Sequence, residues 1–277
     1  MGVRRPTAVS EAVGVVGFIW RHPANRGRRA RQLGRAVSFQ VRARLFGHRV
    51  LAPVGRSGQI WVDLHRRAAT KALYANPPDW PEMAVWQERL SPGDLFLDVG
   101  ANVGTYTVFA ASLGATVVAF EPAHDTVELL RENVALNGYD DVEVVEAAAG
   151  AAASTVQFTS GLDSVNRVDD HGGASVTMVT LDSIIGDRTV AGMKVDVEGF
   201  EIDVLRGASR ALADHRIELM QLEWNDASVE AVGSDRAPVA ELLASHGYAL
   251  YRPDADGRLV ATRDAAGIAD VFAAPVR

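Results

Sequence analysis

The feature that most constrains the fold of this chain is a glycine-containing turn directly behind an apolar segment. The turn runs from Asp98 through Gly100 to Gly104 with the sequence D-V-G-A-N-V-G, and Glu121 ends the next apolar segment along the chain. Glycine has no Cβ and tolerates positive φ, so the backbone amides of such a turn can approach a bound molecule closely. An acid at the end of the following strand can bind both hydroxyls of a ribose. Together these residues predict a site for a cofactor that contains adenosine.

The positions of the glycines indicate which adenosine cofactor fits. A dinucleotide fingerprint requires glycine at its first, third and sixth positions, whereas Gly100 is followed here by Asn102 and Thr105 at the third and sixth. A pyrophosphate site is therefore disfavoured. S-adenosyl-L-methionine has no phosphate and carries a positive sulfonium and an amino-acid end, so a carboxylate such as Asp98 suits it. We expect S-adenosyl-L-methionine to be the cofactor.

Apolar segments alternate with helical segments behind a turn at 91–94. The expected strands cover residues 95–99, 116–120, 142–146, 193–197 and 217–222. Helices are expected after Gly104, at 123–137 and up to Leu205, and this alternation predicts an α/β fold with a parallel sheet and crossover helices. A closing hairpin is expected at 248–262. The polar stretch at 160–174 is long enough to act as a lid, and residues 34–47 are ambiguous between helix and strand.

Composition and pattern divide the chain into three expected parts. These are a basic N-terminal extension at 1–50, a lead-in of strand and helix at 51–90, and a cofactor-binding domain at 91–277. With 277 residues, 48% of them hydrophobic, the chain can bury one large core. It has no cysteine, which excludes disulfides and thiolate metal sites.

The first 50 residues are strongly basic, although the whole chain carries a formal charge of −7. They hold eleven arginines and one acid, Glu11, a balance of +10 that leaves −17 for the remainder. We expect this part to contact an anionic surface. Three candidates are open: phospholipid head groups, a phosphorylated carrier, or the acidic face of this same protein. No nucleic-acid partner is expected.

An apolar run at 12–20 follows Arg4 and Arg5. It is too short to cross a bilayer as a helix, and Arg21-His22-Pro23 stands where a signal peptide would have its cleavage site. We therefore expect a cytoplasmic protein. The run and its arginines fit peripheral contact of residues 1–50 with an anionic inner membrane face, and the alternative is a solvated or self-packed basic helix.

Carboxylates also follow two later apolar segments. Alternation along a strand places Lys194, Asp196 and Glu198 on one side, and Glu223 ends the segment before it turns polar. A hydroxyl that attacks a methyl sulfonium must lose its proton, so Asp196, Glu198 and Glu223 are candidates for the catalytic carboxylates. The same three acids could instead hold magnesium. We expect a reaction without a metal, because nothing in their spacing demands one.

Simpler explanations exist for these residues. Asp196 could cap a helix that begins at Glu198, and Glu198 and Glu201 could complement the dipole of that helix; we expect a structural role for Glu201. His124 and His171 are weaker candidates for the base, since single histidines in loops are usually solvated. Asp163 and Asn166 share the expected lid and are candidates for substrate contact by location alone.

Four motifs, in this order, resemble the FkbM family of S-adenosylmethionine-dependent methyltransferases. They are D-V-G-A-N-V-G at 98–104, F-E-P at 120–122, T-L-D at 180–182 and K-V-D-V-E-G-F-E at 194–201. The first marks only the wider class I methyltransferase fold, and the fourth is far more specific. The resemblance covers about residues 58–273 and leaves out the arginine-rich start of the chain.

The resemblance implies a fold, a reaction and a set of cofactor contacts. The fold is a Rossmann-like α/β sheet of seven mostly parallel strands with helices on both faces, and the reaction is O-methylation of a hydroxyl on a polyketide, sugar or glycolipid. Glu121 would hold the ribose, and Glu146 and Ala148 would lie beside adenine. The methionine end would be surrounded by Asp98, Gly100, Asn102 and Gly104. We expect Thr105 to bind the cofactor as well.

Two other functions remain open at this point. One is a membrane-associated scaffold that keeps the fold with a nonproductive pocket, against which the intact acids and glycines count. The other is a nicotinamide-dependent oxidoreductase, which the missing glycine opposes. The preferred interpretation is an O-methyltransferase with a small-molecule or glycolipid acceptor that offers a free hydroxyl.

Overall fold

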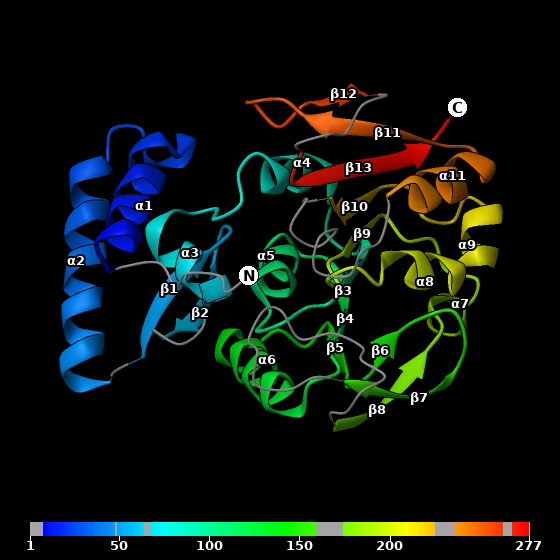
Figure 1. Cartoon of the computed structure of the whole chain (residues 1–277), viewed down its shortest axis with the longest axis horizontal. Helices are drawn as coiled ribbons and strands as arrows, with labels where there is room; N and C mark the ends of the chain where they lie inside the picture. The colour runs from blue at the N-terminus through cyan, green and yellow to red at the C-terminus, as the bar shows by residue number, and fades with distance from the viewer. Residues whose placement is uncertain are drawn as a thin grey trace, which may run out of the picture.

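The computed structural model describes residues 8–47, 49–63, 67–158, 174–224, 236–262 and 268–276. Two helices at the start of the chain stand at one end of the molecule, and a large sheet with helices on both faces forms the rest (Figure 1). In this part of the chain no helix is both long and apolar enough to cross a membrane.

The large sheet has eight strands in the order β12-β11-β13-β10-β9-β3-β4-β5. They are β3 (Leu95–Val99), β4 (Thr116–Phe120), β5 (Val142–Val145), β9 (Gly192–Val195), β10 (Met220–Glu223), β11 (Tyr248–Pro253), β12 (Leu259–Ala261) and β13 (Asp270–Pro275). The pairs from β5 through β4, β3 and β9 to β10 are parallel, and β13 and β12 pair antiparallel to their neighbours. The predicted Rossmann-like α/β class is confirmed.

The number of strands differs from the seven that the resemblance implies. β12 adds an eighth, because the turn at Asp254–Gly257 folds it back onto the edge of β11. The closing hairpin predicted at 248–262 is therefore present, whereas β13, which separates that hairpin from β10, was not predicted.

The order of strands reverses next to β3, since the chain leaves β3 for β4 on one side and returns later to β9 on the other. Open α/β sheets bind ligands outside the carboxyl ends of their strands at such a switch point. The carboxyl ends of β3, β4 and β9 are therefore where the fold places a site.

Alternating side chains of the sheet pack into two cores, one on each face. Phe96 and Val117 face α5 (Thr105–Ser112) and α6 (His124–Asn137) in one core. Leu97 and Val118 belong to the other core. That core is completed by α7 (Leu181–Ile185), α8 (Glu201–Arg206), α9 (Ser209–Ala213) and α11 (Ala237–Ser245).

A small second sheet lies beyond β5. It contains β6 (Ala148–Ala149), β8 (Ala174–Val179) and β7 (Ser154–Phe158) in that order. The lid predicted at 160–174 lies, apart from Ala174, outside the described residues.

The N-terminal part is helical before it meets the sheet. It contains α1 (Ala8–Arg21), η1 (Pro23–Asn25), α2 (Arg29–Phe46), the hairpin of β1 (Val50–Val54) and β2 (Gly58–Val62), α3 (Arg67–Tyr74) and α4 (Glu82–Arg89). The ambiguous stretch at 34–47 belongs to α2, whose residues Ala36, Phe39 and Ala43 are buried at helical spacing. Asn133 of α6 joins this part to the core, accepting from Trp61 N at 2.8 Å and donating to Val103 O at 2.8 Å.

Candidate functional site

A pocket of about 180 Å³ opens at the switch point. Its walls come from the carboxyl ends of β3, β4 and β9, the start of α5, and the segment between β5 and β6. Lys71 and Asp79 close it from the α3–α4 segment. Residues more than one hundred positions apart in the sequence therefore share one cavity.

The turn behind β3 requires glycine at two positions. Gly100 has φ +84°, and a Cβ there would overlap the carbonyl oxygen of Asp196. Gly104 has φ +91°, and a Cβ there would meet the side chain of Leu130. Between them Asn102 adopts φ +51°, supported by a hydrogen bond from Val103 N to its own Oδ1 at 2.7 Å. The turn thereby brings β3 and β9 close together at the mouth of the pocket.

Asp98 is buried at the base of the pocket, with 1% of its surface exposed. Its Oδ2 accepts a hydrogen bond from Thr107 Oγ1 at 2.6 Å, whereas its buried Oδ1 accepts none from the residues that the structure describes. Burial raises the pKa of this carboxyl, and the positive charge of Lys194 opposes the rise. A buried acceptor without a donor fits the ammonium group of S-adenosyl-L-methionine, which is positively charged and can donate a hydrogen bond.

Glu121 organises the opposite wall. Its carboxylate accepts from Asn102 N at 3.0 Å and from Ala123 N at 2.9 Å, and only 7% of the residue is exposed. A carboxylate is a hydrogen-bond acceptor with two oxygens, so its chemistry suits the hydroxyl donors of a ribose. Thr105 and Ala148 also line the pocket.

Gly104 and Glu146 do not line the pocket in the way the resemblance implied. Gly104 lies just behind the wall, as the residue before α5. The carboxylate of Glu146 pairs instead with His124 Nδ1 at 2.7 Å and Arg131 Nη1 at 3.2 Å. His124 itself has 70% of its side chain exposed in that pair. The structure thus places both His124 and the carboxylate of Glu146 outside the cavity.

The three candidate carboxylates converge beside Asp98. Asp196, Glu198 and Glu223 each place an oxygen within 4.8 Å of the other two. Asp196 and Glu198 line the pocket, and Glu223 stands behind them at the end of β10. The proposed helix cap is wrong, because α8 begins at Glu201 rather than Glu198. Glu198 instead occupies a turn with φ +52°, a conformation that is uncommon for a residue other than glycine.

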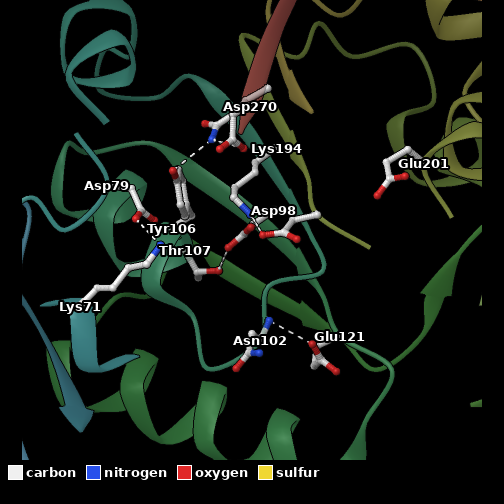
Figure 2. A network of polar contacts seen from close by, with 12 residues as sticks. Lys71, Asp79, Asp98, Asn102, Tyr106, Thr107, Glu121, Lys194, Glu201 and Asp270 are labelled. Carbon is white, nitrogen blue, oxygen red and sulfur yellow. Dashed lines mark hydrogen bonds and ion pairs between the residues drawn. The ribbon is translucent and has the colours of Figure 1, made fainter. Parts of the chain in front are cut away.

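Lys194 lines the pocket and lies close to Asp98 (Figure 2). Its Nζ lies 2.6 Å from Asp196 Oδ2 and 4.7 Å from the centre of the Tyr106 ring. Burial lowers the pKa of Lys194, but the charges of Asp196 and Asp98 outweigh burial and raise it. Burial raises the pKa of Asp196, but the positive charge and hydrogen bond of Lys194 outweigh burial, so the pKa of Asp196 is lowered overall. This pair therefore stays charged near neutral pH.

Several polar residues near Lys194 were not predicted as site residues from the sequence. Lys71 Nζ binds Asp79 Oδ1 at 2.9 Å, and Gln221 Nε2 donates to Tyr106 Oη and to Asp270 Oδ1, each at 3.1 Å. Gln221 is fully buried between the apolar residues Met220 and Leu222, and a polar residue in that position is a signal that could have marked it. Lys71 and Asp79 gave no local signal, since neither lies in a recognisable motif.

Other candidates fall outside the site. Glu201 lies apart from the cluster in Figure 2. It accepts from Gly199 N at 3.1 Å and pairs with Arg236 Nη1 at 2.7 Å. The pair with Arg236 joins the start of α8 to the start of α11, which agrees with the structural role expected for Glu201. Asp163, Asn166 and His171 lie outside the described residues.

Comparisons with known proteins identify the family of this chain. The model of the methyltransferase FkbM domain matches residues 98–250. Hexuronic acid methyltransferase AglP of Haloferax volcanii is 28% identical over 57% of this chain and 64% of its own length. The 31-O-demethyl-FK506 methyltransferase FkbM of Streptomyces tacrolimicus is 29% identical over 58% of this chain and 75% of its own length. The chain thus spans less than two thirds of the archaeal relative.

Solved structures give more distant likenesses. A TehB-like SAM-dependent methyltransferase from Corynebacterium glutamicum has a TM-score of 0.40 at 13% identity, over 69% of this chain and 84% of its own. A SAM-dependent O-methyltransferase from Thermotoga maritima has a TM-score of 0.41 at 15% identity, over 72% and 66%. The family match covers more than half of the chain and includes both the turn behind β3 and the carboxylates behind β9 and β10. The chain therefore belongs to the FkbM family of methyltransferases, which use S-adenosyl-L-methionine.

Proposed function

We propose that this protein is an O-methyltransferase that acts on a hydroxyl of a sugar, a glycolipid or a polyketide-type natural product. The proposal rests on the convergence of Asp196, Glu198 and Glu223. We call the part of the pocket beside these carboxylates its acceptor end. Carboxylates accept hydrogen bonds from hydroxyls, and one of them can take the proton that the hydroxyl loses. The names of two relatives, which specify a hexuronic acid and 31-O-demethyl-FK506, are consistent with such acceptors.

We assign different parts of the cofactor to different walls of the pocket. Asp98 would hold the positive methionine end, with Gly100, Asn102 and Thr105 lining the wall beside it. Glu121 would hold the ribose and Ala148 would contact adenine, whereas the paired carboxylate of Glu146 makes its own adenine contact the least supported of these roles. The bound S-adenosyl-L-methionine supplies an activated methyl group.

Glu198 is the proposed general base. It lines the pocket, and its turn lies between the strand end that holds Asp196 and the start of α8. Asp196 is a weaker base, because its ion pair with Lys194 lowers its pKa. Asp196 and Glu223 would orient the acceptor hydroxyl for in-line attack, which supplies much of the rate because the methyl donor is already activated. The proposed reaction needs no metal.

The experiment is transfer of a labelled methyl group from S-adenosyl-L-methionine to a panel of acceptors. The panel contains neutral glycosides, uronic acids, primary amines and macrolides with one free hydroxyl. The proposal predicts a labelled methyl ether, which withstands alkaline hydrolysis. A base-labile methyl ester or an N-methyl product would contradict it.

A pair of variants tests the role of the base. Glu198→Gln keeps the size of the side chain but cannot take a proton, and we expect turnover to fall by about 10²-fold to 10⁴-fold. Glu128→Gln, on the exposed face of α6, is the matched control with unchanged turnover. Normal turnover of Glu198→Gln would remove Glu198 from the role of base.

A further inference from the structure

The N-terminal helices carry a surface that the methyltransferase site does not use. Ten large apolar side chains are exposed among the described residues, and six of them lie on α1 and α2 with exposed fractions between 48% and 69%. We call these six residues and the arginines around them the N-terminal surface. The six are Val13, Val16, Trp20, Val37, Val41 and Leu45.

The six apolar side chains follow helical spacing and point away from the protein core. On α2 the residues Val37, Val41 and Leu45 recur every four positions, opposite the buried stripe of Ala36, Phe39 and Ala43. Val13, Val16 and Trp20 form the corresponding exposed stripe on α1, where Ile19 is the buried residue. α1 packs against α2, and Arg29 at the start of α2 stacks 5.1 Å from the Trp20 ring. The two stripes therefore belong to adjacent helices at one end of the molecule (Figure 1).

The surface is also strongly basic. Residues 8–47 contain eight arginines and one acid, Glu11. Arg31 and Arg42 are exposed on the same side of α2 as the apolar stripe, at its border. An apolar stripe bordered by arginines matches a phospholipid bilayer, in which a layer of phosphates lies directly above acyl chains.

We infer that the N-terminal surface binds the face of an anionic phospholipid bilayer, with Val37, Val41 and Trp20 entering the acyl boundary and the arginines contacting phosphates. A second copy of the chain is a poorer occupant. A two-fold interface would place each set of arginines against itself. The four other exposed large apolar side chains of the described residues offer no counterpart patch, because Leu51, Leu136, Val260 and Val276 lie on different elements or at the chain end.

The surface is joined to the pocket wall by buried hydrogen bonds. Asn25 Nδ2 donates to Tyr74 O at 2.9 Å and to Ile19 O at 3.1 Å. His22 Nε2 is bonded to Pro78 O at 3.2 Å. Tyr74 and Pro78 lie within the segment that runs from Lys71 to Asp79. When the N-terminal surface is bound to a bilayer, these hydrogen bonds fix the position of that pocket wall relative to the bilayer. Binding to lipid itself does not depend on the proposed acceptor.

Flotation of the full-length protein with vesicles tests this inference. Vesicles of phosphatidylcholine with 30% phosphatidylglycerol are compared with vesicles of phosphatidylcholine alone. We expect binding to the anionic vesicles only, weakened by added salt. Val41→Glu and the double variant Arg31→Glu/Arg42→Glu should each lower the partition coefficient by about tenfold or more.

Matched controls separate the surface from general effects of charge. Val260→Glu on β12 and Arg89→Glu/Arg258→Glu introduce the same changes at exposed positions elsewhere, and we expect wild-type partition. Affinity for S-adenosyl-L-methionine and the melting temperature verify that each variant is folded. Absence of binding, or equal loss in surface and control variants, would overturn the inference. A dimer that Val41→Glu dissociates would replace the bilayer with a second copy.

Discussion

The two ends of the pocket are built in different ways. The end of the pocket that we propose for the cofactor comes mainly from the turn at 98–104 and the end of β4. There the carboxylate of Glu121 accepts hydrogen bonds from the backbone N of Asn102 and Ala123. The acceptor end collects side chains from α3, the α3–α4 segment, β9, β10 and the turn before α8. The cofactor end is therefore a local structure that tolerates little change, whereas the acceptor end can change residue by residue without loss of the turn. Such a division lets one fold serve different acceptors.

The largest expected effect belongs to Gly100. Gly100→Ala combines an unfavourable φ with an overlap between Cβ and the backbone of Asp196, so β3 and β9 must move apart. We expect affinity for S-adenosyl-L-methionine to fall by about a hundredfold or more. Gly138→Ala is the matched control, because Gly138 also has positive φ but has open space around it. Calorimetric titration of both variants measures the difference, and equal affinities would show that close approach at Gly100 is unimportant.

Lys194 is expected to dominate stability, because it compensates carboxylates at both ends of the pocket. Lys194→Met leaves Asp98 and Asp196 without their buried cation, which costs about 3–5 kcal/mol of unfolding free energy. Arg216→Met, which breaks ion pairs with the exposed Asp187 and Asp214, should lower the unfolding free energy far less, because solvent screens exposed ion pairs. Denaturant unfolding compares the two. Similar losses of unfolding free energy in the two variants would mean that the buried charges around Lys194 stabilise the protein no more than exposed ion pairs do.

Lys71 and Asp79 test whether the lead-in contributes to acceptor recognition. Both line the pocket and pair with each other, and neither belongs to the turn at 98–104 that we propose for the cofactor. We expect Lys71→Met and Asp79→Asn to raise KM for the acceptor by about tenfold, while affinity for S-adenosyl-L-methionine stays unchanged. Steady-state kinetics with each substrate varied in turn provide the measurement. A change in cofactor affinity instead would assign this pair to the cofactor end.

A smaller effect is expected in the dependence of stability on pH. Burial raises the pKa of Asp270 to about 6 and that of Glu82 to about 7. Both folded pKa values lie above the ordinary ones, so the stability these carboxyls contribute is present below their unfolded pKa and is lost as pH rises through about 6 to 7. Asp270→Asn should therefore raise the melting temperature at pH 8 more than at pH 5. Asp187→Asn, at an exposed carboxylate, serves as control, and a difference that does not vary with pH would contradict the assignment.

Sequence predicted best what local patterns encode. The residue ranges expected for the first two strands of the sheet, 95–99 and 116–120, coincide with β3 and β4, because each is a short apolar run that ends in an acid or a turn. The helix expected at 123–137 differs from α6 by one residue, since the Asn137-Gly138 end was a clear cap signal. The residues of the turn after β3 were found for the same reason.

What depends on tertiary structure was not predictable. Residues 34–47 were ambiguous because arginines interrupt the apolar pattern, and only packing against α3 reveals which face of α2 is buried. The role of Lys71 and Asp79 depends on how the lead-in docks on the sheet. Glu146 was predicted as the last residue of the strand at 142–146, but β5 ends at Val145. His124 and Arg131 on α6 draw the Glu146 carboxylate away from the cavity.

The most direct test of two separable ends is one calorimetric titration with S-adenosyl-L-methionine, performed on wild type, Glu121→Ala and Glu198→Gln, with turnover measured on the same samples. We expect Glu121→Ala to lose cofactor binding, since it removes the acceptor for Asn102 N and Ala123 N as well as the proposed ribose contact. Glu198→Gln should bind the cofactor like wild type and lose turnover. Loss of binding in both variants, or in neither, would contradict the account.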